Sequence, residues 1–140
     1  MAKKMELFMP ADIITWVIPS SIVFLFIAYS KGWILANFKS TIPSEASELL
    51  KNSKEVFLLD VRTDNEFSQE RIKGATLIPL HELTESLSKL DKVKNKTIVV
   101  YCRSGNRSVG ASRILSKNGF KPLNLKGGIN SWKQQGFSVV

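Results

Sequence analysis

The sequence predicts an α/β domain with a central parallel sheet flanked by helices, preceded by one transmembrane helix. Two observations lead to this prediction. From Thr41 onward, short apolar runs alternate with segments of helical spacing, an order typical of parallel strands joined by helices. Between Asp12 and Lys31 the chain carries a long uncharged segment. With 140 residues, it has room for one compact domain and an appendage.

The uncharged segment, Ile13 to Ser30, is predicted to be a helix that crosses a membrane. At about 1.5 Å per residue it spans roughly 27 Å, close to the hydrocarbon thickness of a bilayer. If Lys31 extends toward the headgroups, the apolar stretch continues through Leu35. We therefore divide the chain into an N-terminal tail (1–12), a transmembrane helix in contact with membrane lipid (13–36), a linker (37–41) and one domain (42–140).

Basic residues near the two ends of this segment favour an orientation. Lys3 and Lys4 precede it, and lysines at positions 31, 39, 51 and 54 follow it. Because basic residues gather on the cytoplasmic side, we expect a single-pass protein of the plasma (inner) membrane with its C-terminal domain in the cytoplasm. A cleaved signal peptide and a buried core helix are the alternatives, although Glu6 and Asp12 interrupt the basic character of a signal peptide.

The first half of the domain is predicted from apolar spacing and from prolines. Pro43 stands near the start of one helical pattern, and Pro79 stops a brief strand. Leu83, Leu87 and Leu90 have helical spacing. The expected elements, in order, are a short helix (42–50), a strand (56–59), a polar turn or short helix (64–70), a brief strand (76–78) and a helix (80–90).

The second half contains the clearest buried strand, Thr97-Ile98-Val99-Val100-Tyr101. A helix over 109–117 follows, and Asn118-Gly119 is a left-handed C-cap signal for its end. A short strand at 122–125 comes next. Gly127-Gly128 then opens a last helix, which ends at Gly136.

Composition narrows the classes of ligand. The net charge of +8 favours anionic small substrates, acidic partners or anionic lipid. Residues 92–140 hold ten Lys and Arg and no acid, whereas residues 41–91 hold six basic and ten acidic residues. We hypothesise that this basic half attracts anionic donors or anionic lipid; a solvated lysine surface is the alternative. The chain has no basic helix with interleaved aromatics, so nucleic acid is not an expected partner.

The single cysteine, Cys102, excludes an intramolecular disulfide, and no Cys and His cluster offers a metal site. Gly127-Gly128 fits neither a P-loop nor a dinucleotide fingerprint, so no cofactor is expected. Cys102 is therefore either a packed thiol or a reactive one. The lone histidine, His81, is more typical of a surface or core residue than of a catalytic partner.

Cys102 opens a loop, Cys102-Arg103-Ser104-Gly105-Asn106-Arg107-Ser108, between a buried strand and a helix. Sites in α/β sheets form at the carboxyl ends of strands. A helix N-terminus and two arginines should favour the thiolate there. Gly105 lets the backbone curl, so that successive amides can face an anion or a terminal sulfur. The loop therefore predicts a reactive thiol.

This chain closely resembles the rhodanese family from about Ile42 to Phe137. The resemblance rests on ordered pieces: Leu59-Asp60-Val61-Arg62 with Glu66-Phe67, Ile72-Lys73-Gly74-Ala75 with Ile78-Pro79, the Cys102 loop, and Gly127-Gly128 with Trp132. The family usually has Gly-His before the isoleucine of the second piece, where this chain has Glu70-Arg71. The resemblance implies a rhodanese-like fold over 42–140 and a sulfurtransferase of the thiosulfate type.

By this resemblance, Cys102 is the catalytic nucleophile. It takes the outer sulfur from an anionic donor such as thiosulfate, forms a persulfide, and passes the sulfur to a thiol or another nucleophilic acceptor, including a protein. Arg103, Ser104, Gly105, Asn106 and Arg107 are expected to bind the substrate. Asp60 and Arg62 are expected to tie the sheet to neighbouring loops.

Two other functions stay open at this point. One is a membrane-tethered interaction module or sulfur carrier with little turnover. The other is a phosphatase, since some dual-specificity phosphatases share this fold and use a cysteine ahead of an arginine. Their loop needs five intervening residues, whereas Arg107 follows Cys102 after four, and the shorter loop favours sulfur over phosphate.

Overall fold

A computed structural model describes residues 11–140 of the chain, with side chains from residue 15 on. The first ten residues of the predicted tail lie outside the described residues. The elements are α1 (Ala11–Ser30), β1 (Lys39–Thr41), α2 (Pro43–Asn52), β2 (Val56–Asp60), α3 (Asp64–Gln69), β3 (Thr76–Leu77), the 3-10 helices η1 (Leu80–Glu82) and η2 (Leu87–Val93), β4 (Thr97–Tyr101), α4 (Asn106–Lys117), β5 (Lys121–Leu125) and α5 (Gly128–Gln134).

The five strands form one sheet in the order β1-β5-β4-β2-β3, and every neighbouring pair is parallel. The predicted central parallel sheet is thereby confirmed. Asp60, the last residue of β2, pairs in register with Tyr101, the last residue of β4. The loops that follow these two strands therefore leave the same edge of the sheet side by side.

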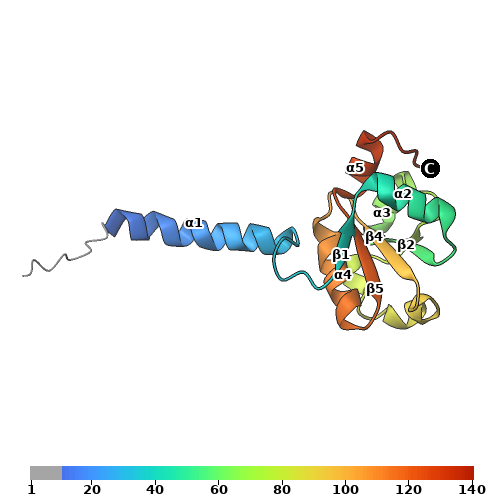
Figure 1. Cartoon of the computed structure of the whole chain (residues 1–140), viewed down its shortest axis with the longest axis horizontal. Coiled ribbons are helices and arrows are strands. Elements are labelled where there is room, and N and C mark those ends of the chain that lie inside the picture. Colours follow the sequence, from blue (N-terminus) through green and yellow to red (C-terminus); the bar gives the residue numbers. More distant parts are fainter. Residues whose placement is uncertain (1–10) are drawn as a thin grey trace, which may run out of the picture.

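Helices cover both faces of the sheet, as predicted (Figure 1). Because side chains alternate along a strand, β4 contributes Ile98 and Val100 to one face and Val99 and Tyr101 to the other. The first face packs against α4 and the segment of η1 and η2; the second packs against α2 and α5. Two separate apolar cores result, one on each side of the sheet.

Three predicted elements differ from the structure. Residues 39–41 of the predicted linker form β1, an edge strand paired with β5. The helix predicted over 80–90 is wrong, because two 3-10 helices occupy that region. Leucines three or four residues apart fit either helix type, since side chains at i and i+3 share a face in both. The helix after the cysteine begins at Asn106 rather than Val109.

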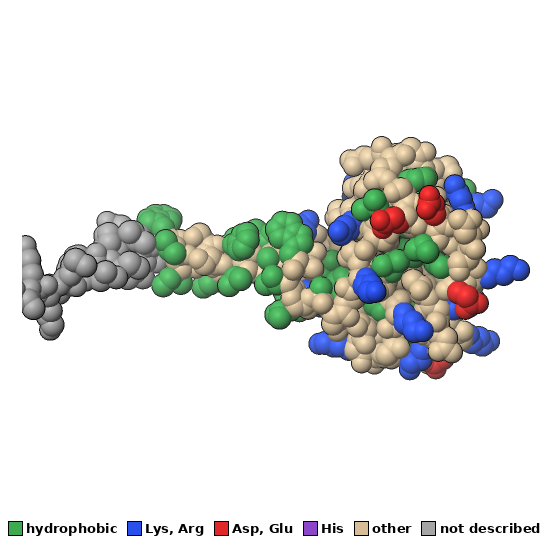
Figure 2. Space-filling view, in the orientation of Figure 1, with side chains coloured by type: hydrophobic (Ala, Val, Ile, Leu, Met, Phe, Trp, Pro, Cys, Tyr) green, Lys and Arg blue, Asp and Glu red, His purple; other side chains and the backbone are tan. Residues whose placement is uncertain are grey.

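Helix α1 extends away from the domain (Figure 1). It ends at Ser30, so the helix predicted to reach residue 36 is wrong in its last part. Gly32 and Leu35 adopt positive φ, and backbone of that kind cannot continue an α-helix. Hydrophobic side chains line the helix from Trp16 on and are exposed (Figure 2). Among the described residues, no helix combines the length and the apolarity that crossing a membrane requires.

Candidate active site at the carboxyl end of β4

Cys102 follows the last residue of β4, and the alternation of the strand sets the direction of its side chain. Its thiol joins the core that Ile98 and Val100 help to form, on the α4 face of the sheet. The residue is 1% exposed. The predicted nucleophile therefore lies at the carboxyl end of β4, where its side chain packs in the core and lies close to the loop that follows.

Two groups of the loop contact the sulfur. The Gly105 N–H donates a hydrogen bond to Cys102 Sγ, with 3.1 Å between nitrogen and sulfur. Ser108 Oγ lies 3.6 Å from Sγ and donates to the Gly105 carbonyl at 3.0 Å. Gly105 itself has φ of 100° and stands directly before α4. A main-chain N–H and the first turn of α4 therefore stabilise negative charge on the sulfur.

The N-terminal end of α5 fixes the carbonyls of the same loop. The N–H groups of Ile129 and Asn130 donate to the carbonyl oxygens of Cys102 and Arg103, at 2.9 and 3.1 Å. This approach requires glycine at position 128, where φ is 58° and a Cβ would lie 2.2 Å from the Cys102 oxygen. With these carbonyls held toward α5, the loop presents the Gly105 N–H to the sulfur.

The two loop arginines have different surroundings. Arg103 is exposed. Arg107 makes two hydrogen bonds of 2.7 Å to the carboxylate of Glu66, on α3. These hydrogen bonds lower the pKa of Glu66 from 4.5 to about 2, assisted by hydrogen bonds from Thr63. Glu66 also raises the pKa of Arg107 against the opposing effect of burial, and the Cys102 sulfur makes a smaller contribution in the same direction as Glu66. Arg107 is thus a positioned cation beside the thiol.

Asp60 and Arg62 form a second, fully buried pair at the same edge. The Arg62 guanidinium donates to both carboxylate oxygens of Asp60, at 2.7 to 3.0 Å, and to the Glu70 carbonyl at 2.7 Å. Arg62 also stacks over the Tyr101 ring, and Tyr101 accepts from the Ile72 N–H. These contacts join β2 to neighbouring loops, in agreement with the structural role expected for the pair.

Two hollows border the site region, and neither is lined by Cys102. A cavity of about 370 Å³ includes both Arg107 and His81 in its wall. His81 is exposed, and its Nε2 lies 3.3 Å from Oε1 of its neighbour Glu82. A second cavity, of about 610 Å³, contacts the loop at Ser104, Gly105 and Asn106. The residues around the 370 Å³ cavity are Val61, Arg62, Thr63, Leu80, His81 and Arg107.

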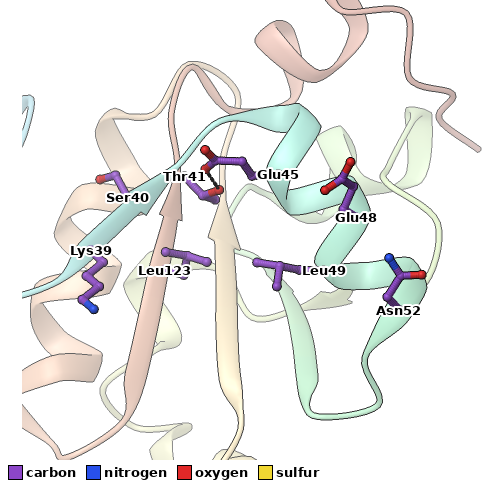
Figure 3. A pocket seen from close by; sticks show the side chains of 8 residues that line it. All are labelled: Lys39, Ser40, Thr41, Glu45, Glu48, Leu49, Asn52 and Leu123. Carbon is purple, nitrogen blue, oxygen red and sulfur yellow. Dashed lines mark hydrogen bonds between the residues drawn. The ribbon is translucent and has the colours of Figure 1, made fainter.

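A third cavity, of about 470 Å³, lies between β1, β5 and α2, and no predicted site residue lines it. Figure 3 shows Thr41 hydrogen-bonded to Glu45, at 2.8 Å, with Leu49 and Leu123 pointing toward each other. Within the described part of the chain, no group of three or more His, Cys, Asp or Glu side chains is placed to hold a metal ion.

The sequence analysis identified the Cys102 loop but did not identify Glu66 and Gly128 as the residues that hold it in position. Glu66 lies 41 positions from Arg107, and Gly128 lies 25 and 26 positions from Arg103 and Cys102. Glu66 entered the sequence analysis only as part of the family resemblance; its local signal was its place three residues after Thr63, with which it forms a capping box. The signal for Gly128 was the Gly127-Gly128 pair, which in the sequence indicates only the start of a helix. The close approach of Gly128 to the Cys102 carbonyl is seen only in the structure.

Comparison with known proteins agrees with this architecture. The chain matches the rhodanese-like domain family over residues 42–135. It is 38% identical over 101 residues to a sulfurtransferase of Allochromatium vinosum, covering 71% of this chain and 92% of that protein. It is also 38% identical over 71 residues to the thiosulfate sulfurtransferase PspE of Escherichia coli, covering 51% and 68%.

A solved structure supports the same assignment. The rhodanese-related protein of Thermoplasma volcanium superimposes with a TM-score of 0.67 at 33% identity, covering 74% of this chain and 98% of that one. The family match over residues 42–135 includes strands β2 to β5 and the Cys102 loop. This chain belongs to the rhodanese-like domain family.

Proposed function

We propose that the protein is a rhodanese-type sulfurtransferase that moves sulfane sulfur from thiosulfate, or another persulfide donor, to a thiol or other nucleophile through a persulfide on Cys102. The observation that carries the proposal is the hydrogen bond from the Gly105 N–H to Cys102 Sγ, at the N-terminus of α4. An amide in this position stabilises a thiolate before the reaction and after each transfer.

The reaction divides into two displacements. The Cys102 thiolate attacks the outer sulfur of thiosulfate; the sulfur–sulfur bond of the donor breaks, and sulfite leaves with the electron pair. An acceptor thiolate then attacks the outer sulfur of the Cys102 persulfide. The bond to Sγ breaks, the Cys102 thiolate leaves, and the acceptor carries the sulfur away. Neither step needs an oxidant or a reductant.

The residues of the Cys102 loop have different roles in this reaction. Arg107, held by Glu66, supplies a fixed positive charge beside the sulfur for the anionic donor. Arg103 is exposed and free to meet the donor outside. Ser104, Gly105 and Asn106 supply the main chain of the turn. Because Cys102 is 1% exposed, the loop around it must move before the donor reaches Sγ.

The test is mass spectrometry of the purified full chain after incubation with thiosulfate. We expect the Cys102 peptide to gain about 32 Da, the mass of one sulfur atom, and cyanide or a thiol to remove it. The Cys102→Ala variant, with folding checked by circular dichroism, should neither gain mass nor turn over thiosulfate. Mass gain without turnover would favour the carrier or interaction module, and no mass gain with any sulfane donor would reject sulfur transfer.

We also propose that α1 attaches the protein to a membrane as a single-pass anchor through residues 13–30, the part of the predicted segment that is helical, with the domain on the cytoplasmic side of the plasma (inner) membrane. Support comes from the absence of charge between Ile13 and Ser30 and from the exposed apolar side chains that include Trp16, Phe24 and Phe26. Expression of the full chain and of residues 37–140, followed by alkaline carbonate extraction of membranes, tests this. Release of the full chain into the soluble fraction would reject the anchor.

A further inference from the structure

The cavity of about 610 Å³ on the flank of the Cys102 loop is built from four segments that are separate in the sequence. These are the turn after α1, Ser40 of β1, the cysteine loop with the start of α4, and the end of β5 with the turn into α5. Its lining residues are Lys31, Gly32, Trp33, Ser40, Ser104, Gly105, Asn106, Val109, Asn124, Lys126 and Gly127.

The chemistry of this cavity suits an anion. Lys31 and Lys126 contribute two positive charges, and no acidic side chain is among the described residues that line it. Within the described residues, neither ammonium group forms an ion pair. Two unpaired cations in one hollow repel each other, and a bound anion removes that repulsion.

Asn124 adds a polar group to the wall of the cavity. It lines the cavity and is 4% exposed. Its Oδ1 is buried without a hydrogen-bond partner among the described residues, and as an acceptor it cannot bind a carboxylate. The Nδ2 amino group of the same carboxamide is a donor, from which a bound carboxylate can accept.

The α1 side of the cavity is fixed to the domain. The Arg113 guanidinium donates to the Tyr29 carbonyl at 2.6 Å and lies 3.7 Å over the Tyr29 ring. Ser116 donates to the Asn37 carbonyl at 2.6 Å. Gly32, with φ of 72°, lets the turn lie against Val109, which a Cβ would meet at 3.3 Å. Lys31 and Trp33 therefore belong to a wall that α4 holds in place.

The cavity and the reactive sulfur share one residue. Gly105 lines the cavity, and its N–H donates to Cys102 Sγ at 3.1 Å. A molecule bound here rests on the turn that carries the sulfur. We propose that this cavity binds the anionic group of the sulfur acceptor, and that the preferred acceptor is a low-molecular-weight thiol bearing one or more carboxylates.

This proposal rests on the proposed function and concerns its second displacement only. The acceptor thiolate attacks the outer sulfur of the Cys102 persulfide; the bond to Sγ breaks, and the acceptor leaves as its own persulfide. Lys31, Lys126 and Asn124 hold the carboxylate and take no part in the bond exchange. Removing the lysines therefore weakens acceptor binding and leaves loading from thiosulfate unchanged.

The experiment uses the full chain, purified in a mild detergent and loaded with sulfur from thiosulfate. Loss of the Cys102 persulfide is followed by mass spectrometry against concentration of glutathione, an anionic thiol, and of 2-mercaptoethanol, a neutral one. The variants are Lys31→Gln, Lys126→Gln and their double, with Lys117→Gln, an exposed lysine of α4 outside the cavity, as the matched loss of charge.

For the double variant we expect transfer to glutathione to fall about fivefold to tenfold through a higher KM, as the loss of one to two exposed charge contacts predicts. Transfer to 2-mercaptoethanol and the loading step should not change, and Lys117→Gln should behave as the parent. Equal slowing with both thiols, an equal effect of Lys117→Gln, or no change in the double variant would overturn the proposal.

If loading with thiosulfate fails, that result rejects the proposed function alone. A binding measurement then still tests whether the cavity binds the anionic group. Trp33 lines the cavity and is 70% exposed, so its fluorescence should respond to S-methylglutathione, which binds without reacting. The response should saturate, weaken about fivefold to tenfold in affinity in the double variant, and vanish in Trp33→Phe. A response that persists in Trp33→Phe, or an unchanged affinity in the double variant, would place the ligand elsewhere.

Discussion

Two arginine–carboxylate pairs stand at the same edge of the sheet and differ in depth. Asp60 and Arg62 are 0% and 2% exposed, whereas Glu66 and Arg107 are 23% and 34% exposed. Both pairs share the bidentate geometry that arginine forms with carboxylates. Arg62 also donates to the main-chain carbonyl of Glu70, whereas Arg107 lies close enough to Cys102 for the two side chains to interact electrostatically.

The comparison indicates that the depth of burial decides the role of an arginine–carboxylate pair. The buried pair is shielded from water, so removing one partner leaves an uncompensated charge in the interior. The half-buried pair is partly screened and contributes less to stability, but its cation remains near the loop where a donor arrives. Under the proposed function, the same chemistry supports the fold in one place and the reaction in the other.

The largest effect is expected on breaking the buried pair. Asp60→Ala leaves the Arg62 charge buried, and we expect the free energy of unfolding to fall by about 3 to 5 kcal/mol. Urea unfolding followed by circular dichroism measures this. A loss below about 1 kcal/mol would mean that water reaches Arg62 and that the two pairs do not differ in depth.

A second variant separates loop geometry from charge. Gly128→Ala places a Cβ against the Cys102 carbonyl, while Gly74→Ala, at φ of 84°, meets nothing within 4 Å. Both pay about 1 kcal/mol for the positive φ, so the difference between them isolates the contact. We expect Gly128→Ala to lose a further 1 to 3 kcal/mol and at least tenfold in the rate of persulfide formation, measured by mass spectrometry.

Equal behaviour of the two glycine variants would contradict this. It would show that the turn at residues 102–103 tolerates displacement and that the charge of Arg107, rather than the brace from α5, governs the reactivity of the thiol.

Breaking the half-buried pair should affect stability less and the reaction more. Glu66→Gln keeps a hydrogen-bond acceptor for Thr63 but loses the ion pair, and we expect about 1 kcal/mol lower stability. Because Arg107 is no longer held, the KM for thiosulfate should change by about threefold or more. Steady-state kinetics measures this, and an unchanged KM would remove Arg107 from donor binding.

The smallest effect is a pH dependence specific to Glu66. Its pKa is lowered from 4.5 to about 2 in the folded protein, so the stability it contributes is present above about pH 4.5 and is lost as pH falls toward 2. The stability difference between the parent and Glu66→Gln should therefore shrink between pH 5 and 3 in urea unfolding. A difference independent of pH over that range would rule out the ion pair as its source.

Local pattern was sufficient for much of the fold. The five residues of β4 were identified because a run of β-branched and aromatic residues suits a strand covered on both faces. The loop after it was identified because its cysteine, glycine and arginines lie together in the sequence. By contrast, the segment at 80–93 was mistaken for an α-helix, and β1 was taken for a linker, since three residues at a sheet edge carry too little pattern.

The sequence by itself determined strands β2 to β5, the parallel sheet and the position of Cys102 at the end of β4, because periodicity and turn chemistry act over a few residues. Tertiary structure alone decided that Glu66 holds Arg107, that α5 fixes the Cys102 and Arg103 carbonyls, and that Lys31 and Lys126 line one cavity. These residues lie 27 to 95 positions apart, and no local rule carries information over that separation.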